Sequence, residues 1–397
     1  MWIFHLMRIS WLLLLIVILA PECAMTSGGN FMKRKDVNTY ILYVGTYSVR
    51  GSKGIYGYRF DPGSGLLTSL GAEAEVINSS FLAFSPNYQF LYAVSETSNF
   101  EGKQSGSLRA YRVDSTTGKL TLLNEVPSLG AGPCYLSVDS TGRYVLTTNF
   151  HGGSIAVFPV LQDGRLGRAS TFLQYSGSSQ DPDRQRTPHP HAIHVAPDNR
   201  SVLVADLGLD KLLFYGFDAR DGLLTAAELP FVELSPGSGP RHFVFHPDAR
   251  RIYVLNEIKS TVSAFLYDKS TRTPHGTQTI STLRNGFSGH NDASELQVDQ
   301  SGRYLYVSNR GADDLGVYSI DTSSGLLSPV QHISSGGRTP RYFALDPTGK
   351  YVIAANEDSD NLVIFRRNES TGKLASTGQA LEVPSPVCLV FVPAHAR

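Results

Sequence analysis

Seven ionisable side chains between residues 191 and 357 are of the types that acid–base chemistry on an anionic molecule requires. They are His191, Arg241, Glu257, Glu295, Arg310, Arg341 and Glu357. Arginine pairs with carboxylate or phosphate groups through parallel hydrogen bonds, while a carboxylate or an imidazole can accept or deliver a proton. Such a set suits the opening or closing of a lactone ring on a sugar acid or a dicarboxylate. No serine stands in a GxSxG motif, so acid–base chemistry is favoured over a covalent mechanism.

An internal repeat predicts that these side chains converge. Six times between residues 80 and 357 an apolar strand leads into a turn and then into a Tyr/Val-rich strand, as in HFVFHPDARRIYVLNE and YFALDPTGKYVIAANE. The turns lie 54, 57, 50, 53 and 47 residues apart, at Ser85, Asp139, Ala196, His246, Asp299 and Asp346. A period of this size with several strands per unit is typical of a β-propeller. Residues at equal distances from each turn therefore occupy equivalent places around one axis.

The two ends of the chain together supply a seventh unit. Residues 386–393 form half of the repeated phrase, and residues 40–47 supply the strand that it lacks. Each complete unit also contains a third strand and a turn with Gly, such as DSTTGKL or NESTGKL, before an outer strand. The sequence thus predicts an all-β, seven-bladed propeller over residues 38–397, with four antiparallel strands per blade. Pairing of the N- and C-terminal strands closes the ring and removes open sheet edges.

Counting from the turns places a polar set at one mouth of the central channel, because the start of strand one and the end of strand two share one face. Five residues before the turns stand Ser80, Cys134, His191, Arg241, Ser294 and Arg341, with Val387 in the seventh unit. Eleven residues after the turns stand Glu96, Phe150, Leu207, Glu257, Arg310 and Glu357, with Tyr47 as the closing counterpart. Glu295 follows Ser294 directly. Ionisable groups crowded into a cleft indicate a functional site, because they cost free energy unless they pair or hold a ligand.

Two alternatives for this set remain open. Opposite charges could form a ring of ion pairs that ties neighbouring blades together, although apolar residues fill nearly half of the circle. His189 and His191 could hold a metal, since alternation places them on the same side of a strand. The nearby arginines would repel a divalent cation, so we expect neither a metal nor a cofactor. His189 is instead predicted to bind substrate, together with Arg341, Glu295 and Glu357.

Composition excludes several partner classes. Lys and Arg balance Asp and Glu, 35 against 35, and no basic stripe is present, which argues against nucleic acid. Residues 38–397 contain no run long enough to span a membrane. Cys134 and Cys388 fall on innermost strands and are expected to be buried free thiols, in preference to a disulfide.

The first 24 residues differ from the rest. His5 and Arg8 precede ten consecutive apolar residues, 11–20, which suit a secretory signal peptide and are too few to span a bilayer. The sequence therefore predicts an exported protein with a linker over residues 25–37. Translation from Met25 or Met32, which would leave a cytoplasmic protein, is the alternative.

Four segments resemble the lactonase family of seven-bladed propellers. They are His189-Pro190-His191, Gly239-Pro240-Arg241-His242, Asn256-Glu257 and Asn309-Arg310. The family includes propeller-type 6-phosphogluconolactonases and fungal carboxy-muconate lactonising enzymes, and the resemblance covers about residues 38–397. The blade phrases GRYLYVSN and GKYVIAANE are also similar to YVTN-type surface repeats, which report scaffold alone. In the lactonising enzymes a His, an Arg, a Glu and a second Arg at these motif positions form the active site. The resemblance thus implies catalytic roles for His191, Arg241, Glu257 and Arg310.

These observations predict a monomeric hydrolase of a small anionic lactone or sugar acid derivative, with a place in carbohydrate metabolism. Arg241 and Arg310 are expected to hold the acid group and the developing oxyanion. Glu257 is expected to activate water and His191 to protonate the leaving alkoxide. Two other functions remain open, an exported propeller that binds without catalysis and a cycloisomerase acting on a muconate-type dicarboxylate.

Overall fold

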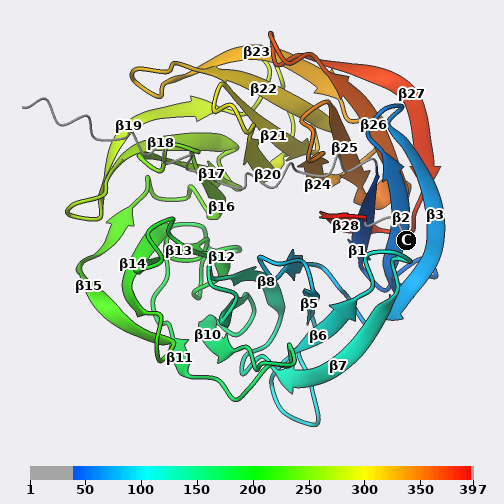
Figure 1. Ribbon diagram of the computed structural model, residues 1–397. Helices are drawn as coiled ribbons and strands as arrows, with labels where there is room; N and C mark the ends of the chain where they lie inside the picture. Colours follow the sequence, from blue (N-terminus) through cyan, green and yellow to red (C-terminus); the bar gives the residue numbers. More distant parts are fainter. Residues whose placement is uncertain (1–38, 395–397) are drawn as a thin grey trace, which may run out of the picture. The chain divides into compact units, whose positions relative to one another are not determined.

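Seven antiparallel sheets of four strands each surround a central axis in the computed structural model, which describes residues 39–394 (Figure 1). This confirms the predicted all-β, seven-bladed propeller. The predicted leader, residues 1–24, and the predicted linker, residues 25–37, lie outside the described residues.

The strands of each blade are given below from the one nearest the axis to the outermost one. Blade 1 contains β4 (Leu82–Phe84), β5 (Phe90–Ser95), β6 (Ser107–Val113) and β7 (Leu120–Pro127). Blade 2 contains β8 (Pro133–Val138), β9 (Tyr144–Asn149), β10 (Ser154–Pro159) and β11 (Thr171–Gln174). Blade 3 contains β12 (Pro190–Val195), β13 (Ser201–Asp206), β14 (Lys211–Asp218) and β15 (Leu223–Glu233). Blade 4 contains β16 (Pro240–Phe245), β17 (Arg251–Asn256), β18 (Thr261–Asp268) and β19 (Thr273–Ser281).

The remaining blades follow the same plan. Blade 5 contains β20 (Asp292–Val298), β21 (Tyr304–Arg310), β22 (Asp314–Ile320) and β23 (Leu327–Ser334). Blade 6 contains β24 (Pro340–Leu345), β25 (Tyr351–Asn356), β26 (Asn361–Arg367) and β27 (Leu374–Glu382), with the short 3-10 turn η1 (Glu357–Ser359) after β25. Blade 7 contains β28 (Pro386–Pro393), β1 (Tyr40–Thr46), β2 (Gly54–Asp61) and β3 (Leu66–Glu75).

The ring closes inside blade 7, as the sequence predicted. Strand β28 pairs antiparallel with β1 in a register that runs from Tyr40 opposite Pro393 to Gly45 opposite Cys388. The last strand of the chain is therefore the innermost strand of the blade that the first strand begins (Figure 1). This pairing satisfies the backbone groups that would otherwise remain open at both ends of the fold.

The repeated Asp has a local role in the hairpin between strands one and two. The carboxylate of Asp299 accepts hydrogen bonds from the backbone N–H groups of Arg303 and Tyr304, both at 2.8 Å. Asp139 makes the equivalent bonds to Arg143 and Tyr144 in blade 2. An Asp that binds the backbone of a following turn in this way fixes the turn, which explains why it marks the repeat.

Tyrosines of the second strands tie neighbouring blades together. The hydroxyl of Tyr306 in blade 5 donates to the carbonyl of Gly372 in blade 6 at 2.8 Å, and Tyr253 in blade 4 donates to Gly325 in blade 5 at the same distance. Gly372 has φ +70°, and a Cβ there would lie 2.3 Å from the ring of Tyr304. The Gly of the outer turn is thus required both by its backbone conformation and by the close approach of the next blade.

A β-bulge interrupts the innermost strand of six blades at its mouth end. In blade 4, Pro240 pairs with Asn256 and His242 with Leu255, so that Arg241 is the additional residue. Equivalent register shifts occur at Cys134, His191, Ser294/Glu295, Arg341 and Val387. A bulge bends its strand and redirects the side chain beside it. All six bulges fall about five residues before the turn, which is one of the two positions from which the site was predicted.

Aromatic rings fill the channel one residue further from the mouth than the bulges. The ring of Phe81 meets Tyr135, His242 and Tyr342, which come from blades 2, 4 and 6, at centroid distances of 3.9 to 6.0 Å. Contacts between blades that do not adjoin around the ring show that the channel is filled at this depth. The channel is therefore closed below the mouth.

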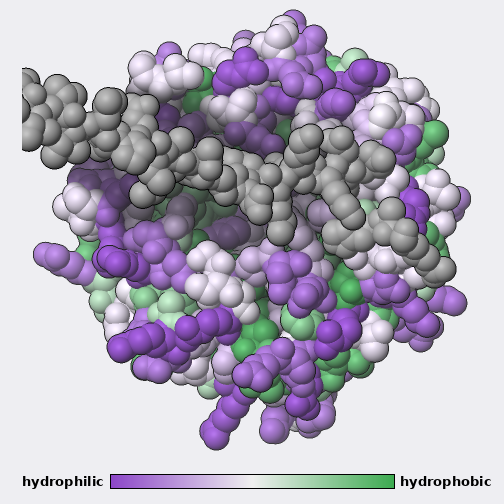
Figure 2. Space-filling model, viewed as in Figure 1, coloured by the Kyte–Doolittle hydropathy of each residue, from purple (hydrophilic) through white to green (hydrophobic). Residues whose placement is uncertain are grey.

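One face of the propeller, seen along the axis, shows mostly hydrophilic residues around its edge, with hydrophobic ones scattered among them (Figure 2). Within residues 39–394, no helix is long and apolar enough to cross a membrane.

Candidate active site

Glu257 lies at the centre of a cluster of three arginines, which we call the arginine cluster: Arg184, Arg241, Arg310 and Glu257 itself. Its Oε2 is 2.9 Å from Nε of Arg241 and 2.9 Å from Nη2 of Arg310. Its Oε1 contacts Nη2 of Arg184. Arg241 precedes Glu257 in blade 4, whereas Arg310 ends β21 of blade 5 and Arg184 belongs to the loop before β12. Three elements that are distant in sequence thus bring their charges to one carboxylate.

Exposure increases stepwise from the floor of the cluster to its surface. The side chains of Arg241 and Glu257 are each 4% exposed, that of Arg310 is 14% exposed and that of Arg184 is 37% exposed. Arg184 also lies 3.5 Å from Asp292, at the rim. A ligand that approaches from solvent therefore meets Arg184 first and Arg310 next.

The electrostatics of the cluster keep Glu257 ionised. Burial acts to raise the pKa of Glu257, but the charges of Arg310 and Arg241 outweigh it and hold the pKa well below its ordinary value. Burial and the neighbouring charge of Arg310 lower the pKa of Arg241 to about 10. A carboxylate held so firmly in its ionised form is a weak proton acceptor.

One guanidinium nitrogen of the cluster has no partner among the described residues. Nε of Arg310 is buried and makes no hydrogen bond, whereas Nε of Arg241 and Nη2 of Arg310 lie 2.9 Å from Oε2 of Glu257 without being aligned for a hydrogen bond. Buried polar groups in native proteins usually find hydrogen-bond partners. An unpaired guanidinium donor is suited to an oxyanion or a carboxylate.

His191 lies beside this cluster and is 5% exposed. Its ring packs edge-on against Phe150 and His242, with centroid distances of 5.3 and 5.1 Å, and its Nδ1 is 3.8 Å from the thiol of Cys134. Burial and the charge of Arg241 lower its pKa well below the ordinary value. The imidazole is therefore neutral at physiological pH and can accept a proton.

Arg341 and Glu357 belong to a second polar group on the other side of the mouth. Arg341 donates to the hydroxyl of Tyr47 at 2.7 Å and lies 3.6 Å from Glu357. Tyr47 donates to Glu96 at 3.1 Å, and Ser80 also binds Glu96. This group joins blades 6, 7 and 1 through the hydrogen bonds of Tyr47, and its one ion pair, between Arg341 and Glu357, lies within blade 6. The charge of Arg341 also lowers the pKa of His191, after burial and Arg241.

Glu295 does not face the mouth. It is 5% exposed, and its Oε2 lies 3.0 Å from Nδ1 of His242. The bulge in β20 places Glu295 one residue deeper than Ser294, level with His242 in β16.

His189 is half-buried at the edge of the mouth. Its ring stacks on Phe150 at 4.4 Å, and its Nδ1 lies 2.9 Å from the carbonyl oxygen of Phe150.

Within residues 39–394, no group of three or more His, Cys, Asp or Glu side chains is placed to hold a metal ion. Cys134 and Cys388 are buried free thiols, as predicted.

Comparison with known proteins identifies the family. The family model described as "Lactonase, 7-bladed beta-propeller" matches residues 41–391. The chain belongs to this lactonase family. The lactonase is 36% identical over 353 residues to the 6-phosphogluconolactonase of Bacillus subtilis, covering 89% of this chain and 98% of that protein. It is 32% identical to the 6-phosphogluconolactonase of Formosa agariphila, covering 76% of this chain and 85% of that protein. The solved structure of the periplasmic gluconolactonase of Pseudomonas aeruginosa matches with a TM-score of 0.85 and 35% identity, covering 90% of this chain and all of that one.

Two residues of the lactonase site were missed by the sequence analysis as candidates. Arg184 lies in an irregular loop, at no repeated distance from a turn, so counting from the turns could not find it. His242 could have been found, because its equivalents in five other blades are Phe81, Tyr135, Ala192, Tyr342 and Cys388. An ionisable residue stands out against that set. Only Glu295, at the same position in blade 5, was noticed.

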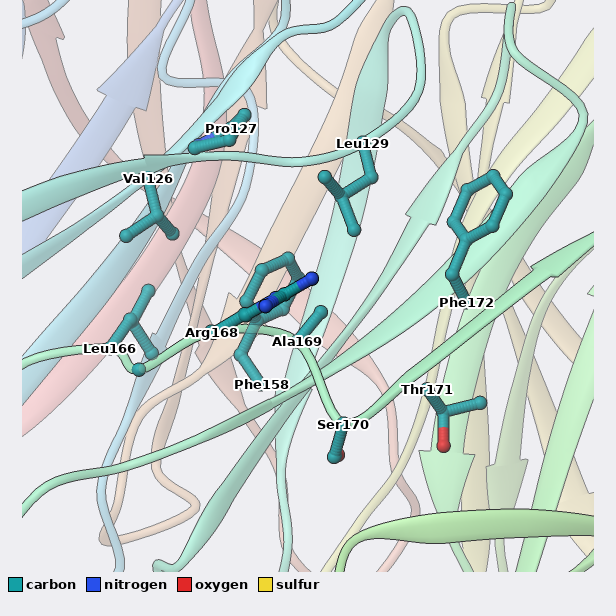
Figure 3. A pocket seen from close by; sticks show the side chains of 11 residues that line it. Val126, Pro127, Leu129, Phe158, Leu166, Arg168, Ala169, Ser170, Thr171 and Phe172 are labelled. Carbon is teal, nitrogen blue, oxygen red and sulfur yellow. The ribbon is translucent and has the colours of Figure 1, made fainter.

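A groove of about 560 Å³ lies elsewhere on the lactonase, between the outer strands of blades 1 and 2 (Figure 3). Its lining combines apolar side chains such as Leu129, Phe158 and Phe172 with one cation, Arg168. It contains no carboxylate or imidazole that could transfer a proton. The side chains that could carry out lactone chemistry lie at the mouth and not in this groove.

Proposed function

We propose that the lactonase hydrolyses a small anionic sugar lactone at the mouth of the propeller, by general acid–base catalysis without a covalent intermediate. The observation that carries this proposal is the convergence of a neutral His191 with the three guanidinium groups around Glu257. A base and a set of oxyanion donors are the two components that ester hydrolysis by water requires.

In the proposed mechanism His191 acts first as base and then as acid. The neutral imidazole takes a proton from water as the water oxygen attacks the lactone carbonyl. The imidazolium then gives that proton to the ring oxygen, which leaves as the hydroxyl of the open acid. Glu257, whose charge raises the pKa of His191, stabilises the imidazolium that forms between these two steps.

The arginines stabilise negative charge. Arg310 and Arg184, the more exposed members of the cluster, face the carbonyl oxygen and the anionic substituent of the substrate. Arg241 lies behind them and holds Glu257. Fixed donors that point at a developing oxyanion lower the barrier because they need no reorganisation during the reaction.

This assignment exchanges two roles that were expected from the sequence. Glu257 was expected to activate water and His191 to act only as an acid. The pKa values of both groups are lowered, but three arginines engage the carboxylate oxygens of Glu257, whereas the imidazole of His191 is neutral, so we assign the base to His191. Glu257 then orders the guanidinium groups.

For the substrate we propose an aldonolactone of the gluconolactone class, with or without a phosphate. The relatives named 6-phosphogluconolactonase and periplasmic gluconolactonase support this class. The apolar leader of residues 11–20 supports export, and outside the cytoplasm an unphosphorylated sugar lactone is the more accessible substrate. Cell fractionation tests export: protein recovered outside the cytoplasm supports it, and protein confined to the cytoplasm contradicts it.

A panel assay tests the function. Purified protein is mixed with gluconolactone, 6-phosphogluconolactone and a muconolactone, and acid release is followed by pH-stat with the spontaneous rate subtracted. Rapid acid release from a sugar lactone is the expected result. Saturable binding without acid release would identify a binding propeller, and isomerisation without uptake of water would identify a cycloisomerase. Either result would overturn the proposal.

Replacing Arg184 with Gln should raise KM for an anionic lactone by about tenfold, because a charged hydrogen bond contributes about 1.5–3 kcal/mol and solvent weakens it at a partly exposed position. We expect a smaller change in kcat. Arg186→Gln in the same loop is the matched control, since that side chain is 75% exposed and pairs with Asp183. Equal KM values for the two variants would remove Arg184 from the site.

A further inference from the structure

A long connection between blades 2 and 3 brings Arg184 to the mouth. Residues 175–189 join β11 to β12, whereas residues 335–339 make the same connection between β23 and β24. We call residues 179–187 of this connection the strap, and it is from the strap that Arg184 contacts Glu257. Long irregular connections in a compact domain usually have a function of their own.

Gln185, the next residue in the strap, is fully buried. It is 0% exposed, whereas the flanking side chains of Arg184 and Arg186 are 37% and 75% exposed. Within residues 176–187 no other residue is buried. Polar side chains are buried where their hydrogen-bonding groups are satisfied, so this Gln indicates a specific anchor in an otherwise accessible loop.

The hydrogen bonds of Gln185 close the strap and fasten it to blade 3. Its side-chain Nε2 donates to the carbonyl of Leu207 at 2.7 Å, and its Oε1 accepts from the backbone N–H of Asp181 at 2.9 Å. The backbone N–H of Gln185 donates to the carbonyl of Asp181, and its carbonyl accepts from the N–H of Ser179, both at 2.9 Å. One residue thus joins the two halves of the strap and attaches them to the end of β13.

The point of attachment is a position that lines the mouth in other blades. Leu207 stands eleven residues after its turn, as Glu257 does in blade 4 and Arg310 in blade 5. Leu207 is buried and brings no charge to the site. The strap that is fastened to its carbonyl supplies Arg184 in its place, so blade 3 contributes to the arginine cluster through the strap and not through the end of its second strand.

Two further anchors hold the backbone on either side of Gln185. The carboxylate of Asp181 accepts from the backbone N–H of Arg184 at 2.9 Å, and the hydroxyl of Ser179 donates to Asp210 at 2.6 Å. Asp210 is 3% exposed and also accepts from the N–H of Gly239, in the loop that leads into β16, at 2.7 Å. A side chain on a backbone that is already fixed loses less freedom when it binds a ligand.

We propose that Gln185 is a positioning residue that holds the strap against Leu207 and so fixes Arg184 as the donor for the charged substituent of the substrate. The proposal rests on the proposed function, because it assigns Arg184 to a lactone. It adds that the preference for a phosphorylated over an uncharged sugar lactone depends on the strap. When the bonds of Gln185 are removed, Arg184 must be ordered at each binding event, which weakens binding and leaves proton transfer at His191 unchanged.

Steady-state kinetics with two substrates test the positioning role. Gln185→Ala should raise KM for 6-phosphogluconolactone by up to about tenfold, since it acts through Arg184, whose own removal has that effect. We expect kcat for both lactones and KM for uncharged gluconolactone to stay nearly unchanged. In an Arg184→Gln background the same replacement should add little, because the two residues act as one unit.

Gln180→Ala is the matched control, because Gln180 is an exposed strap residue whose side chain makes no hydrogen bond within residues 39–394. Both KM values should match those of the unmodified protein. The proposal is overturned if Gln185→Ala leaves KM for the phosphorylated lactone unchanged, raises KM equally for both lactones, or adds its full effect to that of Arg184→Gln.

Limited digestion with trypsin separates failure of this proposal from failure of the proposed function, because it needs no turnover. Trypsin cuts after arginine, and a protease cuts a folded loop when the loop opens locally. Gln185→Ala should be cut after Arg186 several times faster than the unmodified protein and the Gln180→Ala control, with an unchanged midpoint of urea unfolding. Cleavage of Gln185→Ala at the unmodified rate would show that Gln185 does not hold the strap, and would overturn the proposal even if sugar lactones are hydrolysed.

Discussion

Replacing His191 with Asn should lower kcat by about 10²–10⁴-fold, which is the usual contribution of a general base. His191 is the only neutral imidazole that our mechanism places in contact with the reacting groups, and no neighbouring side chain can replace it in proton transfer. KM should change much less than kcat, because the arginines hold the substrate. Stopped-assay measurement of acid release over a range of lactone concentrations gives both parameters.

The matched control is His275→Asn. His275 is exposed on the outer strand β19, far from the mouth, so this change should leave kcat unaltered. If His191→Asn hydrolyses the lactone as fast as the unmodified protein, His191 is not the base. The mechanism would then have to return that role to Glu257.

Replacing Glu257 with Gln should destabilise the fold by about 3–5 kcal/mol, because removal of one partner leaves a buried charge uncompensated. Arg241 and Arg310 would then face each other at the mouth without the carboxylate between them. Glu257 is held ionised in the folded state, so its contribution is present above the pKa of the unfolded chain and is lost as the pH falls through the lower folded value. Urea unfolding near pH 7 measures the change.

Turnover should also fall in Glu257→Gln, because the arginines lose the group that orders them. Glu233→Gln serves as the control: Glu233 forms an exposed ion pair with Lys211, which is worth about 0–1 kcal/mol. A Glu257→Gln protein that kept its full stability but lost turnover would contradict our assignment. That result is the one expected of a base whose charge is not needed for the fold.

Much of the architecture could be predicted because the repeated signals are local. The Asp of each turn binds its own backbone, the Gly of each outer turn needs a left-handed conformation, and the strands between them are apolar. Asp299, Tyr304 and Gly372 show these three roles in the structure. The closure of the ring could also be predicted, since residues 40–47 and 386–393 each lack a partner anywhere else.

The arginine cluster could be predicted only in part. Fixed distances from the turns predicted that Arg241, Glu257 and Arg310 lie close together, and the structure places both arginines in contact with Glu257. Arg184 reaches the same carboxylate from a loop with no periodicity, so no count could include it. The bulges in the innermost strands also break the alternation of side chains, and for this reason Arg241 and His242 both reach the interior of the ring.

The roles of the residues depend on burial and distance, which a sequence does not contain. A Glu beside two arginines and a His nearby are compatible with either acting as base. We assign the base to His191 because three arginines engage the carboxylate of Glu257. The second polar group, with Arg341, Glu357 and Tyr47, likewise proved to be internally paired, which counting from the turns could not reveal.

The most direct test of the central claim is a crystal structure with the product acid 6-phosphogluconate bound. We expect the acid at the mouth, with one of its anionic groups between Arg184 and Arg310 and its carboxyl carbon within reach of His191. Product bound in the groove between blades 1 and 2, with the ion pairs of Glu257 undisturbed, would contradict the claim that the mouth is the active site.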